Sequence, residues 1–431
     1  MKTCAIFCAS VCLLLTSPVH AEDVLNGANT AWILTSTALV LFMTLPGLAL
    51  FYGGLVSKKN VLSILMQCFA IAGIISIVWM IIGYSLAFGT GNNFIGDTSK
   101  MFMNGIGRGT LSGDIPESLF AIFQMTFAII TPALIIGGFA ERMKFSAVLI
   151  FSVAWVLLVY APICHWVWGG GWLGDMGVFD FAGGIVVHIT AGVAALIAAL
   201  VLGPRRGFGT AAIMPHNMTM TVTGAAMLWV GWFGFNGGSA LAANGDAAMA
   251  IFVTHISASA GAMTWMFIEW IRHGKPSALG AVTGMVAGLG TITPASGFVG
   301  PGGALVIGIL AGIICFYATY YIKQGLKIDD SLDVFPVHGV GGVLGTLCAG
   351  IFSATSLGVL SGYGFADGIT SIGGQFKVQL IGVVAAIAYT AIVTWIILKG
   401  VGLLTGGLRV SEEDEQKGLD ITDHNETGYS L

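Results

Sequence analysis

The chain has 431 residues, of which 56% are hydrophobic and only 9% are charged, and its formal net charge is −4 at pH 7. Soluble domains carry about 25% charged residues, so the composition excludes the soluble classes and gives no reason to expect a nucleic-acid partner. The mean hydropathy of +0.90 points the same way. We therefore expect an all-α, multi-pass membrane protein.

The first 21 residues form a separate unit. Lys2 is followed by the apolar stretch CAIFCASVCLLL, and Val19 and Ala21 are small residues before a possible cut. This order is typical of a secretory signal peptide, and we expect cleavage after Ala21. The alternative is a further membrane helix, which the short apolar stretch disfavours, because a span needs about 20 residues.

Eleven apolar runs follow, each roughly as long as a bilayer requires. They cover residues 31–55, 61–89, 118–140, 144–164, 181–202, 218–238, 248–271, 278–296, 302–322, 337–353 and 378–404. We number them as spans 1 to 11. The four cysteines in or beside these runs form no CxxC pair, which indicates packing residues rather than a metal or redox site. No cofactor and no bound metal are expected.

Basic residues set the expected orientation. The connectors after odd-numbered spans carry Lys58, Lys59, Arg142, Lys144, Arg205, Arg206, Arg272, Lys275, Lys323 and Lys327, whereas those after even-numbered spans hold only Lys100, Arg108 and Lys377. Positive charge favours the cytoplasmic side. We therefore expect the N-terminus outside, as a cleaved leader would leave it, and the C-terminus inside a bacterial inner membrane.

Spans 1–5 and 6–10 form two possible inverted repeats, with span 11 added at the end. Span 1 contains GLALFYGG and span 6 contains GWFGFNGG, and an aspartate followed by a histidine opens spans 5 and 10. Inverted repeats with a site between them are a common transporter plan. The predicted organisation is a leader at 1–21, a membrane domain at 22–404 and an acidic cytoplasmic tail at 405–431. The tail is either disordered or a docking segment.

Ionisable residues inside a membrane are costly and are therefore candidates for function. Asp180 precedes span 5, where it can cap the helix or take part in handling a cation or proton. Asp333 is expected to play the same part at the inner start of span 10. Glu269 is expected to form an interfacial ion pair near Arg272. His255 has no such pattern and is expected to be structural.

His188 and His338 are expected to meet in the middle of the membrane. His188 lies eight residues after Asp180, about 12 Å along a helix, and His338 lies about 8 Å in from the opposite face. A neutral imidazole has one donor and one acceptor nitrogen, so two facing rings can share one proton. The alternative is two separately satisfied packing histidines.

Aromatic residues gather near the outer ends of the spans. Phe123 and Phe127 share one helix face, Phe235 and Ser239 share another, and Trp168 belongs to the segment HWVWGGGW with Trp166 and Trp172. These residues are either an interfacial aromatic belt or a cation–π cup for a small cation, in which Ser239 accepts a hydrogen bond.

Long motifs in order along the chain carry a family resemblance. They are GLALFYGGLV, GYSLAFG, GGFAERMKFSAVLIF, DFAGGIVVHITAGVAALIAALVLGPR, GWFGFNGGSA, DVFPVHGVGG and GLRVSEEDEQKGLD. The chain resembles the ammonium transporter/methylammonium permease/Rhesus family over essentially its whole length after the leader. The loops at 90–117 and 354–374 match poorly. The resemblance implies a homotrimer with one pore in each subunit, and a cytoplasmic PII-type regulatory protein as partner.

The resemblance also implies roles for particular residues. Phe123, Trp168 and Ser239 would form an outer vestibule for ammonium, which Asp180 would support electrostatically. Phe127 and Phe235 would be a stacked gate beneath it. His188 and His338 would line a hydrophobic pore for ammonia, and a proton relay between them is a further hypothesis.

The resemblance implies ammonium uptake as the function. An apolar pore would make this uptake selective, because ammonium can shed a proton and cross as ammonia, whereas potassium cannot. We expect no enzymatic activity. An ammonium sensor with little flux remains an alternative, and an intramembrane metalloenzyme would lack a compact ligand motif.

Overall fold

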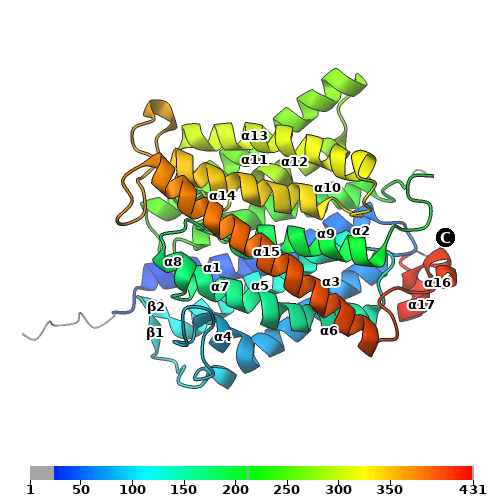
Figure 1. Ribbon diagram of the computed structural model, residues 1–431, viewed down its shortest axis with the longest axis horizontal. Coiled ribbons are helices and arrows are strands. Elements are labelled where there is room, and N and C mark those ends of the chain that lie inside the picture. Colours follow the sequence, from blue (N-terminus) through cyan, green and yellow to red (C-terminus); the bar gives the residue numbers. More distant parts are fainter. Residues whose placement is uncertain (1–23, 211–212, 430–431) are drawn as a thin grey trace, which may run out of the picture.

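Long apolar helices run side by side through the molecule, and they carry almost all of its regular structure (Figure 1). The computed structural model describes residues 24–210 and 213–429, and the leader predicted at 1–21 lies outside them. The strands described are the short antiparallel pair β1 (Leu111–Ser112) and β2 (Ile115–Pro116). The all-helical class predicted from the sequence is therefore confirmed.

The first five predicted spans are built from several helical pieces, some with π-helical turns. They are α1 (Gly27–Phe42), η1 (Met43–Leu48), α2 (Ala49–Leu55), α3 (Val61–Val78), η2 (Trp79–Gly83), α4 (Tyr84–Phe88), α5 (Glu117–Phe139), α6 (Phe145–Trp155), η4 (Val156–Tyr160), α7 (Ala161–Trp168), η5 (Gly184–Ile189) and α9 (Thr190–Leu202). The short η3 (Met101–Met103) and α8 (Trp172–Asp175) lie in the connections between spans.

Spans 6, 9 and 10 also contain π-helical turns, whereas spans 7, 8 and 11 are single helices. The elements are α10 (Met218–Trp232), η6 (Phe233–Gly237), α11 (Gly245–His273), α12 (Ala278–Ile292), α13 (Pro301–Tyr320), η7 (Tyr321–Gly325), η8 (Phe335–Gly339), α14 (Val340–Phe352) and α15 (Ile372–Leu404), with η9 (Gly358–Leu360) in a connection. The π turns η1 and η6 fall in spans 1 and 6, and η5 and η8 fall in spans 5 and 10.

Ten helical segments among the described residues are long and apolar enough to cross a membrane. The eighth predicted span is α12, which has only 15 residues. At 1.5 Å per residue it is about 22 Å long, shorter than a hydrocarbon core of about 30 Å. The count of eleven spans and their orientation therefore stay predictions.

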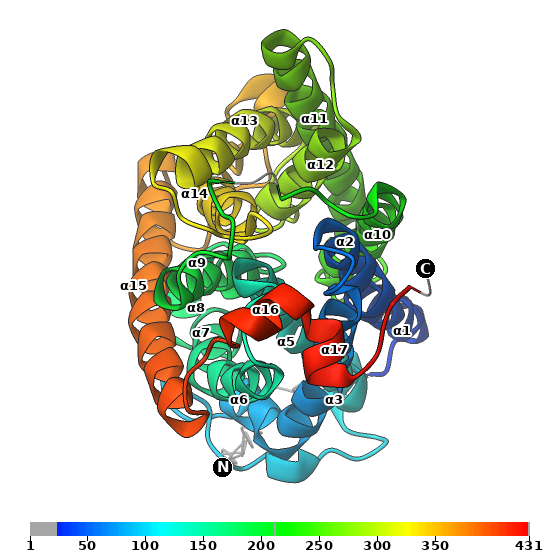
Figure 2. The ribbon, with the colours of Figure 1, turned by 90° about the vertical axis from the view of Figure 1, so that its right-hand side faces the viewer.

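The tail folds back across one end of the bundle, where α16 (Glu412–Lys417) and α17 (Leu419–His424) cover the ends of several helices (Figure 2). Leu419 is fully buried. Asp420 accepts a hydrogen bond of 2.8 Å from the Ser63 amide in the first turn of α3, and Glu415 accepts one of 2.7 Å from the Arg206 amide. Residues 405–429 are thus folded against the bundle, and the role of the tail as a docking segment stays a prediction.

A buried ion network ties three connections together at the same end of the bundle. The Arg205 guanidinium lies 2.6 Å from Glu141 and 2.8 Å from Asp329. Burial alone would raise the pKa of both carboxyls, but Arg205 and further hydrogen bonds outweigh burial and hold both pKa values below their ordinary range. Both groups are therefore charged in the folded protein at neutral pH, and the network stabilises the folded state most when they are ionised.

Arg205→Met is expected to destabilise the protein by about 3–5 kcal/mol, because it leaves two buried carboxylates without their cation. The unfolded carboxyls titrate near pH 4, and the folded ones titrate lower. The stabilisation is therefore present above about pH 4 and is lost as the pH falls through the folded pKa values. The measurement is thermal unfolding in detergent at pH 7 and at pH 3–4. The difference in unfolding temperature between the variant and the parent should be smaller at pH 3–4.

Lys417→Ala removes only an exposed pair with Glu413 and should leave the unfolding temperature unchanged. An Arg205→Met protein as stable as the parent at pH 7 would contradict this account.

Candidate functional site

Asp180 shapes the turn that carries His188. Its two carboxylate oxygens accept four hydrogen bonds of 2.5–3.0 Å from consecutive amides, those of Gly183, Gly184, Ile185 and Val186. Gly183 has a φ of +116°, a backbone conformation that favours glycine. The capping role is thus realised, and the π turn η5 begins directly after it. Such turns often mark functional positions.

Asp180 has no free acceptor site for a ligand, because a carboxylate offers about four and the amides occupy them. Burial raises the pKa of Asp180 to about 6, although the four amide hydrogen bonds act in the opposite direction. The main-chain oxygen of Asp180 accepts a hydrogen bond of 2.8 Å from Trp168 Nε1. The residue therefore fixes the positions of Trp168 and the His188 turn, and it can influence a cation only through its field.

Asp330, not Asp333, caps the turn that carries His338. Asp330 is fully buried and accepts a hydrogen bond of 2.7 Å from the amide of Phe335 at the start of η8. Asp333 instead has a φ of +61°, and its carboxylate pairs with Lys323 at 2.8 Å. The capping role predicted for Asp333 was wrong, because a left-handed residue directs its side chain away from the helix start. Its alternative role in handling a cation or proton stays a prediction. The missed signal was spacing: Asp330 precedes His338 by eight residues, as Asp180 precedes His188.

The two histidines meet as predicted. His188 Nδ1 and His338 Nδ1 lie 3.2 Å apart, and their rings are nearly parallel, at 20°, with centroids 5.2 Å apart. The side chains are 1% and 4% exposed, so bulk water has almost no contact with them. One Nδ1 must donate to the other, because two protonated or two bare nitrogens would repel. The pair can therefore share a single proton.

Aromatic and aliphatic side chains surround the pair. The His188 ring stacks on Trp232 with centroids 5.5 Å apart and on Phe235 with centroids 6.0 Å apart. A small void of about 10 Å³ touches both histidines and is otherwise lined by apolar residues. That volume is close to the lower limit for one water molecule. His188 Nε2 is buried without a partner among the described residues, so a polar group remains available to a molecule of that size.

Phe127 and Phe235 close the path on the side of Trp168. Their ring centroids lie 4.3 Å apart, and both side chains are only 1% exposed. Phe123 packs edge-on against Phe127 at 5.1 Å, and Trp168 does so at 6.0 Å. The structure thus brings together the aromatic residues predicted for a vestibule and those predicted for a gate. By contrast, Trp166 is 7% exposed and belongs to the packed interior rather than to a surface belt.

Ser239 lies one helical turn beyond Phe235, and its hydroxyl donates a hydrogen bond of 2.8 Å to the Phe235 main-chain oxygen. The hydroxyl proton is therefore engaged within the helix. The oxygen keeps lone pairs with which to accept a further hydrogen bond. A half-buried oxygen in this state suits a ligand that donates, as the sequence analysis expected. The neighbouring Gly238 lies against the edge of Phe123, which places Ser239 beside the aromatic group.

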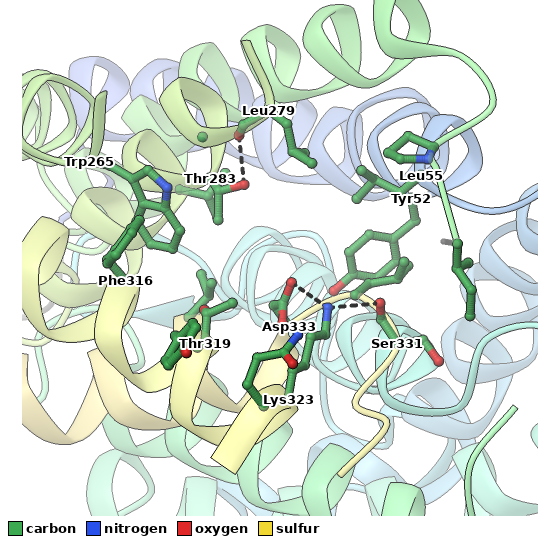
Figure 3. A pocket seen from close by; sticks show the side chains of 18 of the residues that line it. Tyr52, Leu55, Trp265, Leu279, Thr283, Phe316, Thr319, Lys323, Ser331 and Asp333 are labelled. Carbon is green, nitrogen blue, oxygen red and sulfur yellow. Dashed lines mark hydrogen bonds and ion pairs between the residues drawn. The ribbon is translucent and has the colours of Figure 1, made fainter. Parts of the chain in front are cut away.

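A cavity of about 770 Å³ opens from the other side and reaches His338. Its wall includes Tyr52, Asp333 and Lys323, and the Lys323 ammonium group lies between the Asp333 carboxylate and the Ser331 carbonyl (Figure 3). The two approaches to the histidines thus differ. One is closed by aromatic rings, and the other is a wide cavity with charged groups in its wall.

Glu269 does not form the ion pair that the sequence led us to expect. Glu269 lines the large cavity and accepts a hydrogen bond of 2.8 Å from the Ser277 amide. The predicted ion pair with Arg272 is wrong: the guanidinium instead packs over the rings of Phe316, Tyr317 and Tyr320 at 5.4–5.9 Å. His255 lies exposed on the outside of α11, where its ring packs against Trp229, and its expected structural role stays a prediction. In the described ranges, no group of three or more His, Cys, Asp or Glu side chains could hold a metal ion.

Comparisons with known proteins place this architecture among transporters. The model of the Ammonium Transporter Family matches residues 31–429. The chain is 49% identical to a putative ammonium transporter of Methanothermobacter thermautotrophicus, over 94% of this chain and 99% of that protein. It is 48% identical to an ammonium transporter of Bacillus subtilis, over 91% and 96%.

Solved structures agree with these matches. A protein described as a Sensor Amt Protein superposes with a TM-score of 0.85 at 31% identity, over 92% of this chain and 98% of that one. Mep2 of Saccharomyces cerevisiae superposes with a TM-score of 0.82 at 37% identity, over 90% and 89%. The likeness extends over nearly the whole length of each protein.

Asp180→Asn is expected to lower the free energy of unfolding by about 1–3 kcal/mol. The new amide group would face backbone N–H groups that it cannot accept from, and each buried donor left unpaired is costly. Thermal unfolding of the purified protein measures the effect. Asp175→Asn changes an exposed acid in the neighbouring α8 and should be neutral. Equal stability of the two variants would show that the amide cap does not hold the His188 turn.

Proposed function

The chain belongs to the Ammonium Transporter Family, and we propose that it takes up ammonium across a bacterial inner membrane by deprotonating it and conducting ammonia past His188 and His338. The observation that carries this proposal is the contact of 3.2 Å between the two Nδ1 atoms inside a buried, apolar surround. A bare cation is costly in such a surround. Neutral ammonia can cross this apolar surround. A potassium ion, which is similar in size to ammonium, has no proton to leave behind and therefore cannot become neutral.

The outer vestibule would bind ammonium before it loses its proton. Trp168 and Phe123 supply aromatic rings for a cation–π interaction, and the Ser239 oxygen is free to accept a hydrogen bond from the cation. Asp180 would add a negative field without touching the ligand, because its carboxylate oxygens are occupied by amides. The cation would thus be held by weak contacts that can be broken again during transport.

The gate would follow directly. Phe127 and Phe235 close the path with centroids 4.3 Å apart, so passage requires their rings to move. Side-chain rotations of this kind are fast compared with backbone rearrangement. Because His188 stacks on Phe235, a molecule that passes the gate meets the histidine pair at once.

The histidine pair would also carry the proton that ammonium sheds. A shared proton between two Nδ1 atoms can be passed from one ring to the other without water. Transport would then be electrogenic, since one positive charge would cross for each ammonia molecule. The released proton would leave from His338 into the large cavity, whose wall contains charged groups.

We propose that the architecture consists of eleven spans in two inverted five-helix repeats and a final helix, with the N-terminus outside and the tail inside. The matching π turns η1 with η6 and η5 with η8 support the repeat. The resemblance further suggests a homotrimer and a PII-type partner at the cytoplasmic face. The docked tail lies at that face in the proposed orientation, where such a partner would contact it.

A second candidate is an ammonium sensor with little flux. It is favoured by the likeness to a structure described as a Sensor Amt Protein and by a tail that contacts several connections through Glu415 and Asp420. A sensor needs the outer site but not a conducting path. The size of the flux therefore distinguishes the two candidates.

His188→Leu combined with His338→Leu is expected to abolish ammonium current while leaving the protein folded, because both leucines suit an apolar pore but cannot carry a proton. The measurement is current across a supported membrane that bears the purified protein, pulsed first with ammonium and then with potassium. The parent protein should respond to ammonium alone.

Full ammonium current in the double variant would rule out the proton relay. Equal currents with both ions would rule out selection by deprotonation, and negligible flux in the parent would favour the sensor.

Ser239→Ala is expected to raise the half-saturating ammonium concentration by about 10- to 100-fold, since a hydrogen bond to a charged group contributes about 1.5–3 kcal/mol. The maximal current should change little, because the serine lies outside the gate. Ser239→Thr keeps the hydroxyl and should restore most of the affinity. Unchanged half-saturation in Ser239→Ala would show that this oxygen does not bind the cation.

A further inference from the structure

His165 is a fully buried histidine that bridges two main-chain oxygens. It lies in α7, three residues before Trp168, near the outer end of the bundle in the proposed topology. Its Nδ1 lies 2.9 Å from the main-chain oxygen of Ala87, and its Nε2 lies 2.6 Å from that of Asn92. Both ring nitrogens therefore face carbonyl oxygens, which accept hydrogen bonds but cannot donate them.

Two carbonyl partners need two N–H donors. A neutral imidazole carries one N–H and one lone pair, and a lone pair set against a carbonyl oxygen at either distance is repulsive. A ring turned over would place carbon atoms at these positions, but C–H···O contacts span about 3.3–3.6 Å, longer than both observed distances. The imidazolium, in which both nitrogens donate, satisfies both oxygens. The shorter contact also fits a charge-assisted hydrogen bond.

The charge of such a ring would lie where the backbone favours a cation. Ala87 belongs to the last turn of α4, which ends the continuous helical segment Val61–Phe88. The last carbonyl groups of a helix have no partner within it, and together they carry about half a negative charge. The ion pairs of the described residues include none with His165. The helix end and the Asn92 carbonyl thus take the place of a carboxylate.

His216 provides a contrast at the opposite end of the bundle. Its Nδ1 lies 2.8 Å from the main-chain oxygen of Val56, and its Nε2 lies 2.8 Å from the hydroxyl of Tyr429. A hydroxyl group can donate as well as accept, so a neutral His216 satisfies both partners. Each histidine bridges two groups, but only the partners of His165 require two protons on the ring.

The loop at 92–94 is fastened to the segment that carries Trp168. Its three consecutive carbonyl groups accept hydrogen bonds of 2.6–3.1 Å from that segment, and the donors are His165 Nε2, Trp166 Nε1 and the Trp172 amide. Two of these donors precede Trp168 and one follows it. The loop therefore holds the segment on both sides of the residue that the proposed function places in the vestibule.

The main chain of His165 holds the turn after Trp168. Its carbonyl oxygen accepts hydrogen bonds of 3.1 Å from the Gly169 amide and 2.9 Å from the Gly171 amide. Gly169 also lies so close to the end of α4 that a Cβ atom there would collide with the Ala87 oxygen. The same oxygen binds the His165 ring, so the spacing between α4 and the Trp168 turn depends on that ring.

We propose that His165 is an imidazolium at neutral pH and that, in this form, it is a positioning residue that fixes Trp168 in the outer vestibule. Its two N–H groups join the end of α4 and the loop at 92–94 to α7. The inference rests on the vestibule in the proposed function and deepens it by naming the group that holds its aromatic wall. Cation–π attraction depends on where the cation lies over the ring, so a displaced Trp168 would bind ammonium less well.

Solid-state NMR of the parent protein in lipid tests the protonation state without any substitution. Histidine rings carry ¹⁵N, and the carbonyl carbons of alanine or of asparagine carry ¹³C. Coupling to an alanine carbonyl identifies Nδ1 of His165 and coupling to an asparagine carbonyl identifies its Nε2, because no other histidine ring of the described residues contacts either kind of carbonyl. At pH 7.5, where an ordinary histidine is mostly neutral, both nitrogens should be protonated. A bare nitrogen at either position would overturn the proposal.

His216 is the matched control in the same spectra. Labelled valine identifies its Nδ1 through the contact with Val56. This nitrogen should be protonated and the other should be bare, as the hydroxyl partner allows. The comparison shows that the method distinguishes the two kinds of bridging histidine under one set of conditions.

His165→Gln tests the positioning role. A glutamine amide can reach one of the two carbonyl oxygens but cannot bridge both, so the loop should loosen around Trp168. The half-saturating ammonium concentration should rise by about 3- to 10-fold, with little change in maximal current, because the gate and the histidine pair are untouched. His216→Gln should leave half-saturation unchanged. A His165→Gln protein with lower maximal current and unchanged half-saturation would overturn the positioning role.

The two measurements separate this inference from the proposed function. A parent protein with two protonated nitrogens on His165 but no ammonium current would overturn the transport function and support the imidazolium. Ammonium current in a parent with a bare nitrogen on His165 would overturn this inference alone. The NMR result stands even where His165→Gln fails to fold, because it is obtained with the parent chain.

Discussion

One hydrogen bond between two buried imidazole rings constrains much of the surrounding structure. His188 and His338 lie among aromatic and aliphatic side chains, where neither has access to bulk water. The two Nδ1 atoms satisfy each other through a contact of 3.2 Å, and the low polarity around them strengthens that contact. Moving either ring by an ångström would leave two unsatisfied polar groups in an apolar surround. The backbone that holds each ring must therefore be rigid.

Rigidity comes from two buried carboxylates, each eight residues before its histidine. Asp180 binds four successive amides at the start of η5, and Asp330 binds an amide at the start of η8. Both residues pin the first turn of a helix whose π geometry turns a histidine toward the partner ring. A buried aspartate thus caps a histidine-bearing helix at each end of the bundle. A charge at a helix start is favourable, so the caps stabilise the helices that they position.

The sequence predicted the class of fold, the meeting of the two histidines and the aromatic residues around them, because hydropathy and spacing along helices carry that information. It did not predict which acid caps span 10. Asp333 is closer to the histidine along the chain, but its positive φ turns it toward Lys323. Hydropathy also did not reveal that α12 has only 15 residues, or that Glu269 and Arg272 form no ion pair with each other but have other partners. Those features depend on loop conformation and on contacts between helices, which have no periodic signal. The fold of the tail could not be predicted for a similar reason. Its hydrogen-bond partners, such as Ser63 and Arg206, lie far away in the chain.

The two approaches to the histidine pair are unequal, and this asymmetry bears on where selection occurs. On the inner side of the proposed topology, a cavity of about 770 Å³ with charged groups in its wall extends as far as His338, whose side chain is buried. On the outer side, Phe127 and Phe235 exclude water immediately before His188. On the proposed mechanism, a cation that arrives from outside would lose its hydration at the aromatic rings, where the cost of carrying charge further is greatest. On the proposed mechanism, selection by deprotonation is concentrated at the outer rings, and the inner cavity serves to return ammonia and its proton to water.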